Sequence, residues 1–214
     1  MVGARFQMFE GENLKRIDIK DFTYKRFTGH PYIDGVCIPN GGSGAVQVSS
    51  RGDIFQDCPS AEGVIWSGIM NGAFHISEIM EIPKTPSSLG GRIYGTVSNP
   101  AINMTPNQAV TFDLDAIRKD LDGVSISGFS SKAGLSETVL KFSKGLVPKT
   151  SFYVLVDGQI RFSKIDQQVT DDVLDIQVDI RPGDRFLTLM ASQGTDGRTN
   201  FELSLFAEPS LNLE

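Results

Sequence analysis

Few side chains in the 214-residue sequence could carry out catalysis, and their spacing assembles no known catalytic constellation. His30 and His75 are the only histidines, and neither lies in an HExxH spacing or beside a serine in a nucleophile elbow. Cys37 and Cys58, the only cysteines, could form one disulfide or could equally be buried apolar residues. A glycosidase would need two carboxylates facing each other across a cleft, but 26 acidic residues make some pair unavoidable. We therefore predict that the chain is not an enzyme.

Binding chemistry is easier to place, because a sugar is recognised by an aromatic face together with planar hydrogen-bonding side chains on loops. Trp66 is the only tryptophan, and Tyr94 lies in a Gly-Arg-Ile-Tyr-Gly run. Each could be a stacking platform or an ordinary core residue. Residues 192–200 are wholly polar and rich in Gln, Asp, Arg and Asn. This stretch is either a plain solvated loop or a ligand or calcium site, although it lacks the EF-hand spacing.

Composition and charge narrow the class of protein. Twenty basic and 26 acidic residues give a net charge of −6, which argues against binding to the phosphates of nucleic acid. The sequence has no run of about 18 apolar residues, so we expect no insertion into a membrane. No secretory signal is visible at the start, which leaves either a cytosolic protein or a piece of a longer exported chain. Fourteen phenylalanines against one tryptophan predict a core built on phenylalanine.

Hydrophobicity with a period of two dominates the chain. Apolar and polar residues alternate over residues 174–180, which predicts a strand with one buried and one solvated face. Asp157 and Gly158 stand between two strand-like runs and predict a hairpin turn. Asp113 is expected to cap a short helix over residues 114–121. Further strands are expected at residues 17–22, 35–38, 45–49, 63–66, 92–96, 109–112, 124–129, 151–156, 159–162, 185–191 and from 203. This pattern predicts an all-β, antiparallel β-sandwich with one short helix.

A series of spaced motifs in the later part of the chain is similar to one known family. The motifs are residues 91–95 (GRIYG), 100–107 (PAINMTPN), 110–118 (VTFDLDAIR), 153–158 (YVLVDG), 183–189 (GDRFLTL), the loop with Asp196 and Gly197, and residues 207–211 (AEPSL). In this order they resemble the NPCBM-type module, a carbohydrate-binding type of domain first noted beside family 98 glycoside hydrolases. The resemblance covers about residues 60–214. Similar regions occur in exported proteins of planctomycete-like bacteria, some with FecR-type domains, and there it extends to residues 32–59.

The resemblance implies a galactose-binding-like jelly roll over residues 60–214, with residues 1–59 as an N-terminal extension or as additional strands packed on the sandwich. It also implies a non-catalytic carbohydrate-binding module of a larger exported or cell-surface protein, located outside the cytoplasm. One departure is clear. The family commonly has a His-Ala-Asn-like run before its Thr-Phe-Asp-Leu strand, and here Thr105 takes the histidine position while Asn107 keeps the amide. Ligand binding is therefore expected to differ from that of relatives.

The expected sugar site is one loop face of the sandwich. Its candidate residues are Trp66, Asn71, Tyr94, Asn107, Asp196 and Asn200. Either aromatic residue would stack on a sugar ring, while the amides and Asp196 would take hydrogen bonds from its hydroxyls. Folds of this type often carry a structural calcium near the last strand, and Glu208 best matches that position. The alternative function is a structural or protein-interaction sandwich without sugar binding, including a homo-oligomer formed through a sheet edge.

Overall fold

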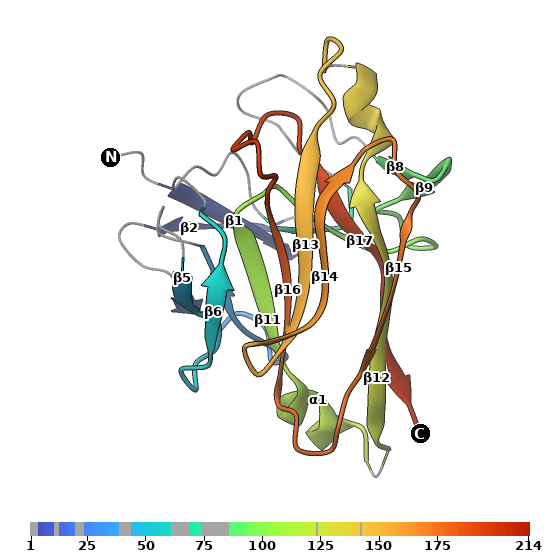
Figure 1. Cartoon of the computed structure of the whole chain (residues 1–214). Helices are drawn as coiled ribbons and strands as arrows, with labels where there is room; N and C mark the ends of the chain where they lie inside the picture. Colours follow the sequence, from blue (N-terminus) through green and yellow to red (C-terminus); the bar gives the residue numbers. More distant parts are fainter. Residues whose placement is uncertain are drawn as a thin grey trace.

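Two β-sheets packed face to face form the body of the molecule (Figure 1). The computed structural model describes residues 4–10, 13–19, 24–38, 44–60, 69–73, 86–122, 124–141 and 143–214, the first two segments as backbone only. The first sheet has the strand order β15 (Leu174–Asp179), β12 (Ile126–Leu135), β17 (Ser204–Leu213), β10 (Ala101–Met104), β7 (Met70–Asn71), β1 (Ala4–Glu10) and β2 (Asn13–Ile19). The second has the order β14 (Gln159–Gln168), β13 (Lys149–Val156), β16 (Phe186–Gln193), β11 (Gln108–Asp113), β4 (Ile33–Cys37) and β3 (Tyr24–Arg26).

The predicted all-β sandwich with one short helix is therefore confirmed. Among the described strands, every pairing is antiparallel except the contact of β1 with β7. The helix α1 (Leu114–Asp120) begins where the sequence predicts, because Asp113 Oδ1 accepts hydrogen bonds from the backbone N–H groups of Asp115 and Ala116 at 3.0 and 3.2 Å. A short 3₁₀ helix, η1 (Glu137–Lys141), follows β12. No helix in the described part of the chain has the length and apolar character needed to cross a bilayer.

The hairpin turn between β13 and β14 is also confirmed. Asp157 and Gly158 have φ values of +50° and +77°, the left-handed conformation that this residue pair favours. Alternation along β13 then sorts its side chains between two layers. Phe152 and Val154 point into the space between the sheets, where the Phe152 ring meets Phe206 of β17 edge to face at 5.5 Å. The centre of the core is thus built on phenylalanine, as the composition suggested.

A hairpin covers the outer face of each sheet. On the second sheet, β5 (Gly44–Gln47) and β6 (Ile54–Cys58) cover the outward side chains of β13, β16 and β11. There Phe55 packs on Tyr153, with ring centroids 5.4 Å apart. On the first sheet, β8 (Ser87–Leu89) and β9 (Arg92–Tyr94) cover β10 and β17. The central strands β13 and β16 are consequently buried on both faces, while β15 has the solvated face predicted for residues 174–180.

Residues from the first part of the chain belong to this sandwich. Strand β4 pairs with β11 in the second sheet, and the β5–β6 hairpin lies on that sheet's outer face. Cys37 of β4 and Cys58 of β6 are buried in the same apolar cluster, and both thiols are free. Burial raises the pKa of the Cys37 thiol, with a contribution from the nearby Cys58, and raises the pKa of the Cys58 thiol to about 12.

Candidate functional site

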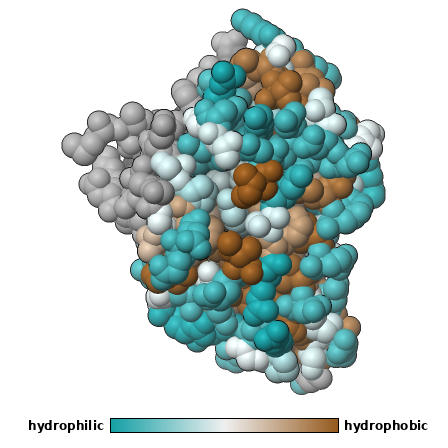
Figure 2. All heavy atoms as spheres, viewed as in Figure 1, coloured by the Kyte–Doolittle hydropathy of each residue, from teal (hydrophilic) through white to brown (hydrophobic). Residues whose placement is uncertain are grey.

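The two ends of the sandwich carry different kinds of connection between the strands. In Figure 1, α1 and the β13–β14 turn lie at the lower end, while the connections that follow β12, β14 and β16 lie at the upper end. Figure 2 shows apolar atoms near the top of the molecule, the end at which Figure 1 places the connection from β12 to β13. The exposed apolar side chains of that connection are Leu140, Leu146 and Val147. Polar and apolar groups therefore meet at the upper end.

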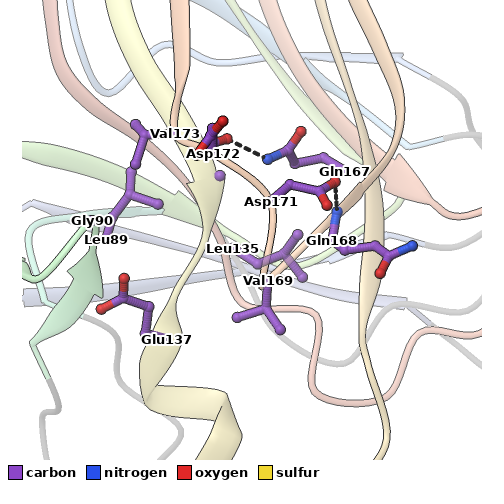
Figure 3. A pocket seen from close by; sticks show the side chains of 11 residues that line it. Leu89, Gly90, Leu135, Glu137, Gln167, Gln168, Val169, Asp171, Asp172 and Val173 are labelled. Atoms are coloured by element: carbon purple, nitrogen blue, oxygen red, sulfur yellow. Dashed lines mark hydrogen bonds between the residues drawn. The ribbon is translucent and has the colours of Figure 1, made fainter.

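A pocket with a volume of about 140 Å³ lies at this end, where the start of η1 faces the connection from β14 to β15 (Figure 3). Its apolar lining consists of Leu89, Leu135, Val169 and Val173. Its polar side chains are Glu137, Gln167, Gln168, Asp171 and Asp172. Gly90 and Gly134 complete the wall. A cavity of this size is smaller than a typical drug-sized site, so it suits one terminal group of a ligand.

Gln167 is the buried polar group of the pocket. Its side chain is 1% exposed, and its Nε2 donates a hydrogen bond to the backbone oxygen of Asp172 at 2.9 Å. Its Oε1 is buried and has no hydrogen-bond partner among the described residues. A buried amide oxygen without a partner costs about 1–3 kcal/mol of folding free energy.

The acidic residues of the pocket are held in place by backbone groups. Glu137 accepts hydrogen bonds from Ser88 Oγ at 2.6 Å and from the backbone N–H of Gly91 at 3.1 Å, which ties the β8–β9 hairpin to η1. Asp171 accepts one from the backbone N–H of Gln168 at 2.8 Å. An apolar wall with fixed acceptors matches a ligand that presents both C–H faces and hydroxyl donors.

The same end buries a carboxyl group in the connection between β16 and β17. Glu202 is 1% exposed, and its Oε2 has no hydrogen-bond partner among the described residues. Burial raises its pKa to about 9, the charges of Asp196 and Asp166 add to this rise, and a hydrogen bond from the Lys149 backbone N–H opposes it. Glu202 is therefore protonated at neutral pH.

Tyr94 does not provide the surface platform that the sequence suggested. It is 2% exposed and packs with Leu89, Ala101 and Leu205 beneath the β8–β9 hairpin. The Arg92 guanidinium lies 5.4 Å from the centre of its ring. The hairpin folds Tyr94 against the outer face of the first sheet. Of the two roles considered for this residue, a stacking platform or a core residue, the structure shows the second.

Asn107 is also internal. It is fully buried with φ of +68°, its Nδ2 donates to Gln193 Oε1 at 3.0 Å, and its Oδ1 accepts from the Gln193 backbone N–H at 3.1 Å. These bonds attach the β10–β11 connection to the end of β16. The amide that matches the family motif thus stabilises the backbone in this structure.

The other predicted binding residues divide into two groups. Asn71, Asp196 and Asn200 are exposed, the last two in the connection between β16 and β17. Trp66 lies outside the described residues, so its role as a platform remains a prediction. None of the described candidates lines the pocket of Figure 3. Sequence reasoning missed the residues that line this pocket, because they come from separate parts of the chain.

The surroundings of Glu208 do not fit a calcium ion. Its carboxylate forms an ion pair with Arg92, with Oε1 2.7 Å from the guanidinium nitrogen. A guanidinium in this position already supplies the positive charge that a calcium ion would bring. Within the described parts of the chain, no group of three or more His, Cys, Asp or Glu side chains could hold a metal ion.

The sequence matches no protein-family model and no curated protein. Solved structures share the fold at low identity. CBM51 from the Clostridium perfringens GH95, solved in complex with methyl-galactose, has a TM-score of 0.50 and 17% identity over 70% of this chain and 95% of that one. CBM51-2 and INT domains of Clostridium perfringens ZmpB, with GlcNAc, have a TM-score of 0.51 and 15% identity over 85% of this chain and 40% of that one. The M60 catalytic domain of ZmpB with CBM51-1 and CBM51-2 has a TM-score of 0.53 and 14% identity over 100% of this chain and 24% of that one.

Proposed function

We propose that this chain is a non-catalytic carbohydrate-binding module of a larger exported or cell-surface protein. The observation that carries the proposal is the pocket at the upper end, where the carboxylates of Asp171 and Asp172 lie beside an apolar wall. Pyranose sugars offer C–H patches and hydroxyl donors, and these two features complement such a pocket. The β-sandwich shared with CBM51 modules and the sequence motifs resembling NPCBM-type modules support the same function.

The proposed binding mode uses acceptors rather than a large aromatic platform. A terminal sugar would place one face on Leu89 and Val173 and donate hydroxyl hydrogen bonds to the exposed carboxylates of Asp171 and Asp172. The exposed side chains Asp196 and Asn200 belong to a neighbouring connection at the same end, and in an extended glycan they would contact a second sugar unit.

The test is a glycan array followed by titration calorimetry with the best ligand. Methyl-galactose and GlcNAc are the first sugars to try, because they were bound to two modules of the same fold. In the variant Asp172→Ala we expect affinity to fall about tenfold, since one acceptor contributing about 1.4 kcal/mol is lost. The free energy of unfolding should change little, because the side chain of Asp172 is exposed.

Asp179→Ala is the matched control, since Asp179 lies on the solvated face of β15 and does not line the pocket. This variant should bind like the unmodified protein. An array without saturable binding to any glycan would contradict the proposed function, and binding unaffected by Asp172→Ala would contradict the location of the site.

A further inference from the structure

The connection from β12 to β13 exposes apolar side chains at the upper end of the molecule. Leu140 of η1, and Leu146 and Val147 after it, are between 42 and 50% exposed. In Figure 1 this connection rises above those from β14 to β15 and from β16 to β17, and Figure 2 shows apolar atoms there. We call Leu140, Lys141 and residues 143–148 the upper tip. Apolar side chains gathered on a projecting surface mark a candidate contact with a partner.

The upper tip is an ordered turn. The backbone N–H of Leu146 donates a hydrogen bond to the backbone oxygen of Ser143 at 2.9 Å. Lys144 and Gly145 between them have φ values of +48° and +86°, which reverse the chain direction. Ser143 is 1% exposed and anchors the turn in the fold. The folded backbone therefore holds Leu146 and Val147 at the surface.

Two lysines give the upper tip a positive charge. Lys141 and Lys144 are exposed, and neither forms an ion pair with a described residue. The one acid of η1, Glu137, accepts its hydrogen bonds from Ser88 and Gly91 of the β8–β9 hairpin. The chain as a whole has a net charge of −6, so the charge of the tip is opposite to that of the rest. An anionic partner is the complementary one.

We propose that the upper tip contacts the surface of a membrane that contains anionic lipids. The boundary between headgroups and acyl chains accepts apolar side chains, and lipid phosphates attract lysines at the same depth. A bilayer can yield around a projecting turn, whereas a folded protein would need a matching concave surface. The contact is peripheral and requires no spanning segment. This inference goes beyond the proposed function and does not depend on sugar binding.

The experiment is sedimentation of the full chain with vesicles that carry no sugar. One set contains phosphatidylcholine alone, and the other also contains about 30% phosphatidylglycerol, each at about millimolar lipid because contacts of this size bind weakly. The chain should sediment with the anionic vesicles and stay in solution with the neutral ones. Raising the salt concentration to about 0.5 M should release most of the bound protein, because ions screen exposed charges.

Variants test each part of the contact. Lys144→Gln should lower partitioning into anionic vesicles about fivefold, and the double variant Leu146→Ser with Val147→Ser should lower it about tenfold. The matched controls lie at the end of the sandwich that carries α1. Lys119→Gln, on the exposed side of α1, and Leu213→Ser, at a residue that is 50% exposed, should bind like the unmodified chain. Circular dichroism of each variant confirms the fold.

Three outcomes would overturn the inference. Absence of sedimentation with either set of vesicles would do so, and would leave the upper tip as a surface for a protein partner. Binding that the double variant leaves unchanged would show that the apolar side chains make no contact. Equal loss in the tip variants and in the controls would place the contact elsewhere. Because the vesicles carry no sugar, none of these results bears on the proposed function.

Discussion

Among single residues, Glu202 is a buried acid whose pKa lies far above the ordinary value for glutamate. A carboxyl group that is buried without a full set of partners is more stable when protonated, and this explains a pKa of about 9. The folded chain therefore holds a proton that the unfolded chain releases near pH 4.5, the ordinary value for glutamate. Between pH 4.5 and 9, the free energy of unfolding falls as the pH rises.

The variant Glu202→Gln should remove this pH dependence, because glutamine keeps the shape and has no proton to lose. At pH 7 we expect the variant to be more stable than the original by up to about 3 kcal/mol, and at pH 4 we expect equal stability. Urea unfolding at pH 4, 7 and 8.5 measures both values. A variant that is less stable at pH 7 would contradict a protonated Glu202 and indicate a satisfied negative charge.

Among the secondary-structure elements, the β5–β6 hairpin determines that the second sheet is buried on its outer face. Alternation over residues 174–180 predicted a strand with one solvated face, and that holds for β15, where Asp175 and Gln177 are exposed. Strands β13 and β16 have no solvated face, because Val46, Phe55 and Cys58 of the hairpin cover their outward side chains. The covering residues lie about a hundred positions earlier in the sequence, so no local pattern in β13 or β16 predicts that their outward side chains are buried.

Truncating the hairpin's largest apolar side chain should show how much this layer contributes to the free energy of unfolding. Phe55 is 1% exposed and contacts Tyr153, so Phe55→Ala should lower the free energy of unfolding by about 3–5 kcal/mol. Gln56→Ala, on the exposed side of the same strand, should change it by less than about 0.5 kcal/mol. Chemical denaturation measures both, and similar losses in the two variants would contradict a buried role for Phe55.

At the scale of the whole molecule, the early strands are part of the sandwich. Strand β4 lies between β11 and β3, so removing residues 1–59 would expose the edge of β11 together with the apolar outer face of β13 and β16. We expect a fragment of residues 60–214 to lose cooperative thermal unfolding or to aggregate. Calorimetry of the fragment and the full chain makes the comparison. A fragment with an unchanged melting temperature would establish residues 60–214 as an independent domain.

Local signals account for what could be predicted from the sequence. The alternation over residues 174–180, the Asp157–Gly158 turn and the Asp113 cap each depend on neighbours a few positions away, and the structure confirms all three. The site was harder to predict. Tyr94 is buried by contacts with Leu205 of a distant strand, and the pocket joins β8–β9, η1 and β14–β15 from separate parts of the chain.

The strand β6 was missed for a related reason. Cys58 precedes a proline in a stretch that resembles a turn, but it is the last residue of the strand and packs into an apolar cluster. Burial of Cys58 depends on Cys37 and Tyr153, which only the assembled sheet brings near it. Polar residues with structural roles, such as Asn107, are equally hard to distinguish from ligand contacts when only their sequence position is known.

The last residue and the pocket lie at opposite ends of the sandwich. Glu214 exchanges two backbone hydrogen bonds with Ser125 at 2.9 Å, beside the start of β12 and at the end of the sandwich where α1 lies (Figure 1). The pocket lies at the other end of β12, beyond Leu135. A sensor surface or bead coupled through a tag after Glu214 would therefore hold the molecule upright, with the pocket facing the solution and open to long glycans.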